Sequence, residues 1–201
     1  MRGLLVDFGG VLTTNVFESF RAFCEREGLD PDKVRRLFRE DPQALGELRR
    51  LERGELTEDE FAEHFGPLLG IEDTGGLVDR LFAGMEADEK MVDAVRAARR
   101  AGVRTGLISN SWGAGRYDRT SFEELFDGVV ISGEVGLNKP RPEIYELGAQ
   151  RVGLSPAECV FVDDLRENCE GAEAVGMTAV LHRGAEGTVT ELERLLGVEL
   201  G

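Results

Sequence analysis

The chain has 201 residues, enough for one α/β domain with a modest insertion. Its 39 Asp and Glu residues outnumber its 24 Lys and Arg residues, and the formal net charge is −15. Such a chain lacks the basic surface that binds nucleic acids or anionic membranes. No apolar run reaches the ~20 residues that span a bilayer, and three cysteines without a CxxC pair argue against a disulfide framework or zinc site. We therefore expect a cytoplasmic protein whose partner is neither nucleic acid nor membrane.

Short apolar segments alternate with helical patterns along most of the chain. The segments that read as buried strands are residues 3–8, 103–108, 128–131, 159–162 and 178–181. Apolar residues recur at helical spacing in residues 88–101, 142–152, 165–175 and 188–196. The last helix is expected to start at Thr188, with Glu191 completing a capping box. This alternation predicts an α/β fold with a doubly wound, Rossmann-like parallel sheet.

Residues 15–87 interrupt this alternation, because they carry only helical patterns. Among them is a capping signal, Thr57 followed by Glu60, which precedes an apolar stretch. About seventy residues of helix are too many for an ordinary crossover between two strands. We therefore predict a core domain made of residues 1–14 and 88–201, and a helical cap subdomain made of residues 15–87.

Polar residues follow three of the predicted strands, where a doubly wound sheet binds its ligands. They are Asp7 after the first strand, Ser109 and Asn110 after the second, and Asp163 and Asp164 after the strand at 159–162. Lys139 precedes Pro140 near the start of a predicted helix. Each of these residues alone is most often a turn, cap or solvated loop residue. Their coincidence at one sheet edge favours a functional site.

The residue types at this edge suit phosphoryl transfer. A carboxylate can attack phosphorus and form an acyl-phosphate that water then cleaves. Mg²⁺ prefers oxygen ligands, commonly one or two carboxylates together with substrate phosphate and water. A lysine and a hydroxyl can neutralise and orient the phosphoryl oxygens.

Four segments of the chain together resemble the haloacid dehalogenase-like hydrolase superfamily. They are DFGGVLT at 7–13, ISNSW at 108–112, NKPRPEIY at 138–145 and FVDDLREN at 161–168. They occur in the family's order and with its spacing, and the helical insertion lies where one branch of the family carries a cap. The stretch from Gly54 to Phe61 also resembles that cap, although it is less specific.

The resemblance implies a role for each matching residue. Asp7 would be the nucleophile, Ser109 would hold the transferring phosphoryl group with Asn110 beside it, and Lys139 would neutralise charge. Asp7, Asp164 and the backbone carbonyl of Gly9 would bind Mg²⁺, and Asp163 would bind it directly or through water. The implied activity is hydrolysis of a small phosphorylated metabolite.

One position departs from the family's phosphatase pattern. Gly9 stands where most of these phosphatases have a second Asp that acts as general acid and base. Losing that proton transfer typically costs roughly 10²–10⁴-fold in rate. Three readings follow: a slow or specialised phosphatase, a haloacid dehalogenase whose halide leaves without a proton, or a protein that binds ligand without turnover. The Asp163–Asp164 pair argues against the dehalogenase, and the otherwise complete residue set argues against the pure binder.

The remaining candidates are aromatic residues and histidines. Trp112 follows Ser109 and Asn110 at the mouth of the predicted site, so we expect it to pack against either the substrate or the cap. The phenylalanines at helical spacing in residues 15–87 are expected to form a cap core rather than a substrate box. His64 and His182 are too scattered to form a metal site.

Overall fold

The computed structural model describes residues 1–113, 117 and 119–201. Its sheet has five parallel strands in the order β3-β2-β1-β4-β5. The strands are β1 (Gly3–Val6), β2 (Arg104–Ser109), β3 (Gly128–Ile131), β4 (Cys159–Asp163) and β5 (Thr178–Leu181). The doubly wound α/β fold predicted from the sequence is confirmed, and the strands lie within a residue or two of their predicted bounds.

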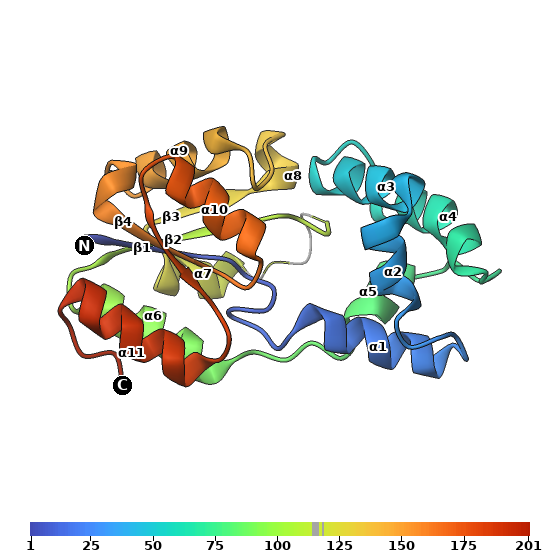
Figure 1. Ribbon diagram of the computed structural model, residues 1–201, viewed down its shortest axis with the longest axis horizontal. Helices are drawn as coiled ribbons and strands as arrows, with labels where there is room; N and C mark the ends of the chain where they lie inside the picture. The colour runs from blue at the N-terminus through green and yellow to red at the C-terminus, as the bar shows by residue number, and fades with distance from the viewer. Residues whose placement is uncertain (114–116, 118) are drawn as a thin grey trace.

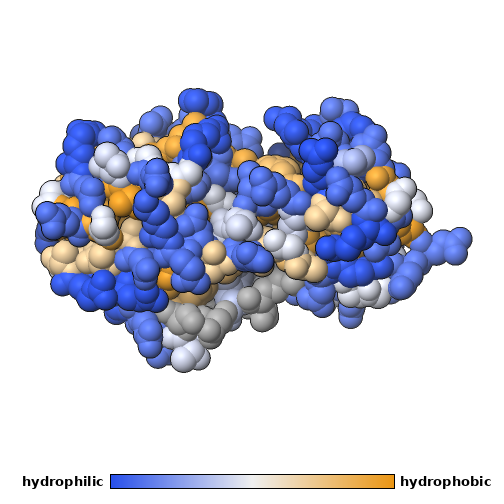
Figure 2. Space-filling view, turned by 90° about the horizontal axis from the view of Figure 1, so that it is seen from below, coloured by the Kyte–Doolittle hydropathy of each residue, from blue (hydrophilic) through white to orange (hydrophobic). Residues whose placement is uncertain are grey.

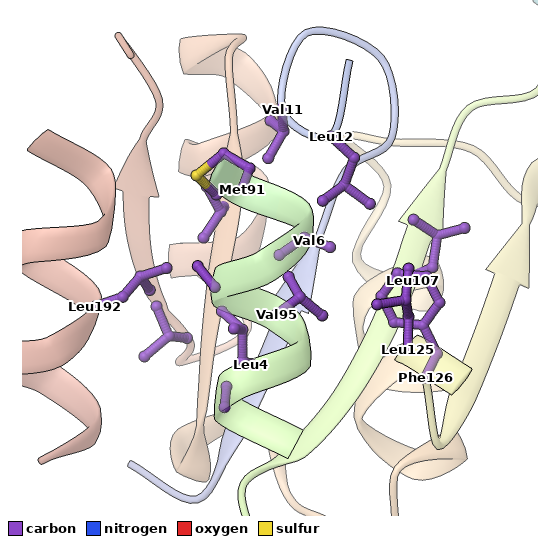
Figure 3. Packing of buried hydrophobic residues seen from close by; sticks show 14 of the residues in the cluster. Leu4, Val6, Val11, Leu12, Met91, Val95, Leu107, Leu125, Phe126 and Leu192 are labelled. Atoms are coloured by element: carbon purple, nitrogen blue, oxygen red, sulfur yellow. The ribbon is translucent and has the colours of Figure 1, made fainter. Parts of the chain in front are cut away.

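Helices cover both faces of this sheet, and this explains the continuous apolar runs in its strands (Figure 1). One face packs against α6 (Glu89–Arg100), α7 (Arg119–Leu125) and α11 (Ala185–Leu196). Figure 3 shows Met91 and Val95 of α6 and Leu192 of α11 beside Leu4 and Val6 of β1. All five of these side chains are completely buried.

The opposite face of the sheet packs against α9 (Pro142–Arg151) and α10 (Arg166–Ala174). Leu5, Ile108 and Phe161 point to this side and contact Ile144 and Tyr145 of α9 in one buried cluster. Two short helical segments, α8 (Ser132–Val135) and the 3₁₀ turn at Pro156–Glu158, lead into α9 and β4. The central strand β1 is therefore enclosed on both faces, which fixes the position of the residue that follows it.

The helices α1 to α5 form a second lobe between β1 and α6 (Figure 1). They are α1 (Val16–Arg26), α2 (Lys33–Glu40), α3 (Pro42–Glu52), α4 (Glu58–Leu69) and α5 (Leu77–Phe82). The lobe has its own buried core, in which Phe23, Phe61 and Phe65 are completely buried. The capping box of Thr57 and Glu60 begins α4 as predicted. Six of the seven phenylalanines in residues 15–87 belong to this core as expected, whereas Phe17 is 37 % exposed and lies outside it.

The chain enters and leaves this second lobe side by side. Thr13 and Ala87 form an isolated antiparallel bridge, Thr14 N–H donates to Glu86 C=O at 2.8 Å, and Asp88 N–H donates to Leu12 C=O at 2.9 Å. The predicted boundaries at 14/15 and 87/88 fall on these two linkers. The division into a core of 1–14 and 88–201 and a cap of 15–87 remains a prediction.

The start of the last helix was predicted wrongly. Helix α11 begins at Ala185 rather than at Thr188, and no capping box forms with Glu191. The Thr188 hydroxyl is instead buried and hydrogen-bonded to His182 Nδ1 at 3.0 Å. The spacing of Thr188 and Glu191 resembles a capping box, but the Thr188 hydroxyl bonds to His182, the residue after β5, and so does not cap the helix.

The surface is rich in hydrophilic residues, as expected for a chain in which 31 % of the residues are charged. The face shown in Figure 2 is mostly hydrophilic, and paler and apolar residues gather near its middle, where the two lobes meet. None of the helices in the described ranges is long and apolar enough to cross a membrane.

Candidate active site

The carboxyl ends of β1, β2 and β4 bring the predicted site residues together. Val6 of β1 lies in register with Leu107 of β2 and Val162 of β4. The next residues along these strands therefore emerge at one edge of the sheet. Asp7, Ser109 and Asp164 border one cavity between the sheet edge and the second lobe.

Lys139 lies at the centre of the buried charges. Its Nζ is 2.8 Å from Asp7 Oδ1 and 2.7 Å from Asp163 Oδ2, and only 2 % of the residue is exposed. Burial alone would lower the pKa of Lys139, but the Asp163 and Asp7 carboxylates raise it above the usual value for lysine. The ammonium is therefore a fixed positive charge beside Asp7.

Asp7 is held by its neighbours through one oxygen. Its Oδ1 accepts hydrogen bonds from Phe8 N–H at 2.7 Å and from Lys139 Nζ. Burial raises the pKa of Asp7 to about 7, although Lys139 opposes the shift. The bonds that the described residues donate to Asp7 both end on Oδ1, which leaves Oδ2 available for chemistry.

Asp163 is saturated with hydrogen bonds. Its Oδ1 accepts from Leu165 N–H at 2.9 Å and from Asn168 Nδ2 at 3.0 Å, and its Oδ2 accepts from Lys139 and again from Asn168. The side chain is completely buried. This arrangement suits a residue that positions Lys139, with little capacity left for a further ligand.

Asn110 holds the backbone of the lysine. Its Oδ1 accepts from Lys139 N–H at 2.8 Å, and its Nδ2 donates to Lys139 C=O at 3.2 Å. The Lys139–Pro140 peptide bond that follows is cis. Asn110 was expected beside Ser109 at the phosphoryl group of the substrate, and its hydrogen bonds indicate that it positions Lys139.

Ser109 lies at the end of β2 with its hydroxyl 3.0 Å from Tyr117 Oη. Tyr117 also packs edge-to-face against Phe8, with ring centroids 5.2 Å apart. Burial raises the pKa of Tyr117, so the phenol stays protonated and can donate. The sequence offered no motif that singles out Tyr117, which lies eight residues beyond Ser109.

Three acidic residues offer a metal site of suitable chemistry. Asp7, Asp163 and Asp164 each present a carboxylate oxygen within 4.8 Å of the others. Burial and the Asp163 charge raise the pKa of Asp164 to about 6, although the charges of Lys139 and Arg183 oppose the shift. Oxygen ligands of this kind fit Mg²⁺. Asp7 and Asp164 are the better candidates, because Asp163 is already saturated.

Of the two glycines after Asp7, Gly10 has the backbone conformation that requires glycine and Gly9 does not. Gly10 has a φ of +75°, and a Cβ there would lie 2.6 Å from Asp164 Oδ2, so a side chain would displace the acidic group. A Cβ at Gly9 would meet only Val16 Cγ2 at 3.0 Å. The φ angle of Gly9 is not positive, so a residue with a side chain could adopt its backbone conformation.

Trp112 extends from the end of β2 into the second lobe. Its ring lies 4.9 Å from the ring of Phe82 and 5.5 Å from those of Phe20 and Phe38, centroid to centroid. It also borders the cavity. Of the two expected partners, the described contacts are with the cap.

Glu52 is a cavity residue that the sequence analysis did not single out. It ends helix α3, and its Oε2 accepts a hydrogen bond from Asn138 Nδ2 at 3.4 Å. Burial raises the pKa of Glu52 to about 7, although the hydrogen bond from Asn138, the charge of Lys139 and the nearby Asn110 amide oppose the shift. The second lobe therefore contributes a carboxyl group to the site.

Residues 1–176 match the haloacid dehalogenase-like hydrolase family. The chain belongs to this family.

The relatives of this chain carry several names. Mouse acyl-CoA dehydrogenase family member 10 is 32 % identical over 160 residues, which span 75 % of this chain and 15 % of the mouse protein. This chain thus covers a small part of that much longer relative. A sesquiterpene phosphatase from Aspergillus oryzae is 28 % identical over 74 % of this chain and 78 % of its own length.

Solved structures confirm the fold of this haloacid dehalogenase-like hydrolase. A HAD-like family hydrolase from Porphyromonas gingivalis matches with a TM-score of 0.73 and 25 % identity over 99 % of both chains. A HAD family enzyme from Bacteroides thetaiotaomicron, in complex with magnesium and inorganic phosphate, matches with a TM-score of 0.68 and 22 % identity. The match covers 90 % of this chain and 93 % of that one. In this chain the fold consists of the five-stranded parallel sheet and a helical insertion after β1.

Proposed function

We propose that this haloacid dehalogenase-like hydrolase is a Mg²⁺-dependent phosphatase that hydrolyses a small phosphate monoester through an aspartyl-phosphate on Asp7. The observation that carries the proposal is the placement of Asp7. Its Oδ1 is fixed 2.8 Å from Lys139 Nζ and accepts from Phe8 N–H, and Asp7 borders the same cavity as Ser109 and Asp164. Phosphatases among the relatives and the magnesium–phosphate complex of a structural neighbour support the same chemistry.

Each residue has a task in this reaction. Asp7 Oδ2 attacks phosphorus and displaces the alcohol oxygen, and water then attacks the phosphorus of the aspartyl-phosphate to release inorganic phosphate. Lys139 and the Ser109 hydroxyl neutralise and orient the phosphoryl oxygens. Asp163 and Asn110 hold Lys139 in place for this role.

Mg²⁺ would be held by Asp7 and Asp164 with the Gly9 carbonyl, and when bound it would neutralise phosphoryl charge. Together with Lys139, the ion would reverse the local sign of this acidic cluster. The net charge of −15 therefore does not oppose binding of an anionic substrate in the cavity.

The substrate class is open to a direct screen. Phosphate release from a panel of phosphorylated metabolites and from an aryl phosphate is measured with Mg²⁺ and with EDTA. We expect turnover that needs Mg²⁺ and is abolished in Asp7→Asn. Equal rates in the variant and the native protein would remove Asp7 from the mechanism.

Two alternative functions, a protein that binds ligand without turnover and a haloacid dehalogenase, are supported by the absence of an acid at Gly9. A protein that binds ligand without turnover would bind phosphate in the screen and release none. A dehalogenase would release halide from haloacids without Mg²⁺. The buried Asp163 and the partly buried Asp164, near Lys139, favour phosphate over halide.

A further inference from the structure

The haloacid dehalogenase-like site lacks an acid at position 9, and the second lobe places another acid at the same cavity. Six glutamates border the cavity among the described residues, and five of them are exposed. The exposed ones are Glu86, Glu89, Glu124, Glu167 and Glu170. Glu52 is the partly buried member of this set, and so the one whose carboxyl group is shielded from bulk water.

The end of α3 that carries Glu52 is fastened to the core. The Ser132 hydroxyl donates to the backbone carbonyl of Glu52 and accepts from Ser111 N–H at 2.8 Å. Two residues on, Gly54 approaches the core so closely that a Cβ there would lie 2.5 Å from Gly133 C=O. The Glu52 backbone is therefore positioned against the sheet edge and not on a free surface of the cap.

The Glu52 side chain faces the residues that hold Lys139. Asn138 Nδ2 donates to its Oε2 at 3.4 Å, and the Asn110 amide that clamps the Lys139 backbone lies close enough to lower the pKa of Glu52. The charged groups around it are Arg49 and Arg53 of the cap and Lys139 of the core. Burial outweighs these cations and raises the pKa of Glu52 to about 7, where an acid can both give and regain a proton.

We propose that Glu52 is the general acid and base of this enzyme, supplied by the cap in place of the missing acid at Gly9. The proposal rests on the proposed phosphatase function. As Asp7 Oδ2 forms its bond to phosphorus and the bond from phosphorus to the ester oxygen breaks, the Glu52 carboxylic acid gives its proton to that oxygen, and the alcohol leaves. Water then attacks the aspartyl-phosphate, its proton passes to the Glu52 carboxylate, and the bond from phosphorus to Asp7 breaks. Both residues return to their starting forms.

The test is the dependence of the rate on the leaving group. Native protein and Glu52→Gln are compared on an alkyl phosphate, whose alkoxide needs a proton, and on 2,4-dinitrophenyl phosphate, whose phenolate does not. We expect the variant to lose roughly 10²–10⁴-fold in kcat/KM on the alkyl phosphate. On the dinitrophenyl ester we expect a loss in kcat/KM of less than about threefold.

Pre-steady-state kinetics give a second readout. Without the base, hydrolysis of the aspartyl-phosphate becomes slow while its formation from the dinitrophenyl ester stays fast. Glu52→Gln should therefore release a burst of dinitrophenolate of about one equivalent per active site, followed by a slow steady rate. A residue that only positions the cap would produce no burst.

Matched variants separate the outcomes. Glu55→Gln removes a glutamate from the same segment that is ion-paired with Arg53 and does not border the cavity, and it should change neither rate. Circular dichroism and thermal unfolding verify that Glu52→Gln is folded. Equal losses on both esters, with no burst, would overturn the role of Glu52 while leaving the phosphatase intact. Native protein that hydrolyses neither ester, with Asp7→Asn indistinguishable from it, would overturn the phosphatase function and this inference with it.

Discussion

Asp163 accepts a hydrogen bond from Lys139 at 2.7 Å in a place where neither side chain is exposed to solvent. A buried ion pair of this kind is costly to break, because removing one partner leaves the other charge in a medium of low dielectric. Because of this ion pair, the adjacent residues Asp163 and Asp164 have different roles. Asp163 positions the lysine, and Asp164 remains free to bind a metal ion.

Asparagine substitutions at these two positions should therefore have opposite signatures. Asp163→Asn should lower the free energy of unfolding by about 3 kcal/mol, because Lys139 keeps only Asp7 as a counter-charge. Asp164→Asn should leave stability within about 1 kcal/mol and weaken Mg²⁺ binding at least tenfold. Urea unfolding in EDTA and calorimetric titration with Mg²⁺ measure the two effects. Identical profiles for the two variants would show that the aspartates share one role.

The pH dependence of stability should report Glu52. Its pKa is raised from 4.5 to about 7 by burial, so the folded protein keeps a proton that the unfolded chain releases. Its contribution to stability is complete below about pH 4.5 and is lost as the pH rises towards 7. Glu52→Gln should therefore be more stable than the native protein at pH 8, on the order of 1 kcal/mol, and no more stable at pH 4.5.

Unfolding in urea with EDTA at several pH values measures this difference. Asp7 and Asp164 also have raised pKa values, but they are present in both proteins and cancel in the comparison. Glu55→Gln serves as the control. A difference between Glu52→Gln and the native protein that stays constant from pH 4.5 to pH 8 would contradict the assignment.

An acid placed at Gly9 should rescue the loss of Glu52. In the Glu52→Gln background, Gly9→Asp should raise kcat/KM on an alkyl phosphate at least about tenfold. On the dinitrophenyl ester it should change kcat/KM little. Gly9→Ala adds the same Cβ, 3.0 Å from Val16 Cγ2, without the acid, and therefore reports the steric cost alone. Equal effects of Ala and Asp at this position would mean that the pocket does not use a carboxyl group there.

Trp112 should couple the core to the cap. Trp112→Ala removes ring contacts with Phe20, Phe38 and Phe82, and we expect it to lower the free energy of unfolding by about 3 kcal/mol. Trp112→Phe keeps an aromatic ring and should cost less than half as much. Circular dichroism in urea measures both variants. An alanine variant as stable as the native protein would show that these contacts contribute nothing to cap docking.

Local patterns in the sequence were sufficient to predict the core fold. Buried parallel strands are apolar throughout, so β1 and β4 could be located before the structure was known. The residues after them could be assigned to one sheet edge because parallel strands end at the same side. The start of α11 could not be located in this way, because Thr188 bonds to His182 across a turn.

The site residues that the sequence did not reveal depend on contacts between distant segments. Glu52 lies in an acidic stretch with Glu55, and nothing local distinguishes the two. Only docking of α3 against Ser132 buries one of them at the cavity. Likewise, the sequence could place Asn110 near the site but could not show that its amide binds the Lys139 backbone.

The bridge between Thr13 and Ala87 has an evolutionary consequence. Because the chain leaves the core and returns at adjacent points, the intervening helices can be replaced by an unrelated insert without altering the sheet or Asp7. In most such exchanges the new insert would alter only substrate preference. Here the proton donor would be exchanged as well, so in this lineage selectivity and proton transfer would be inherited together.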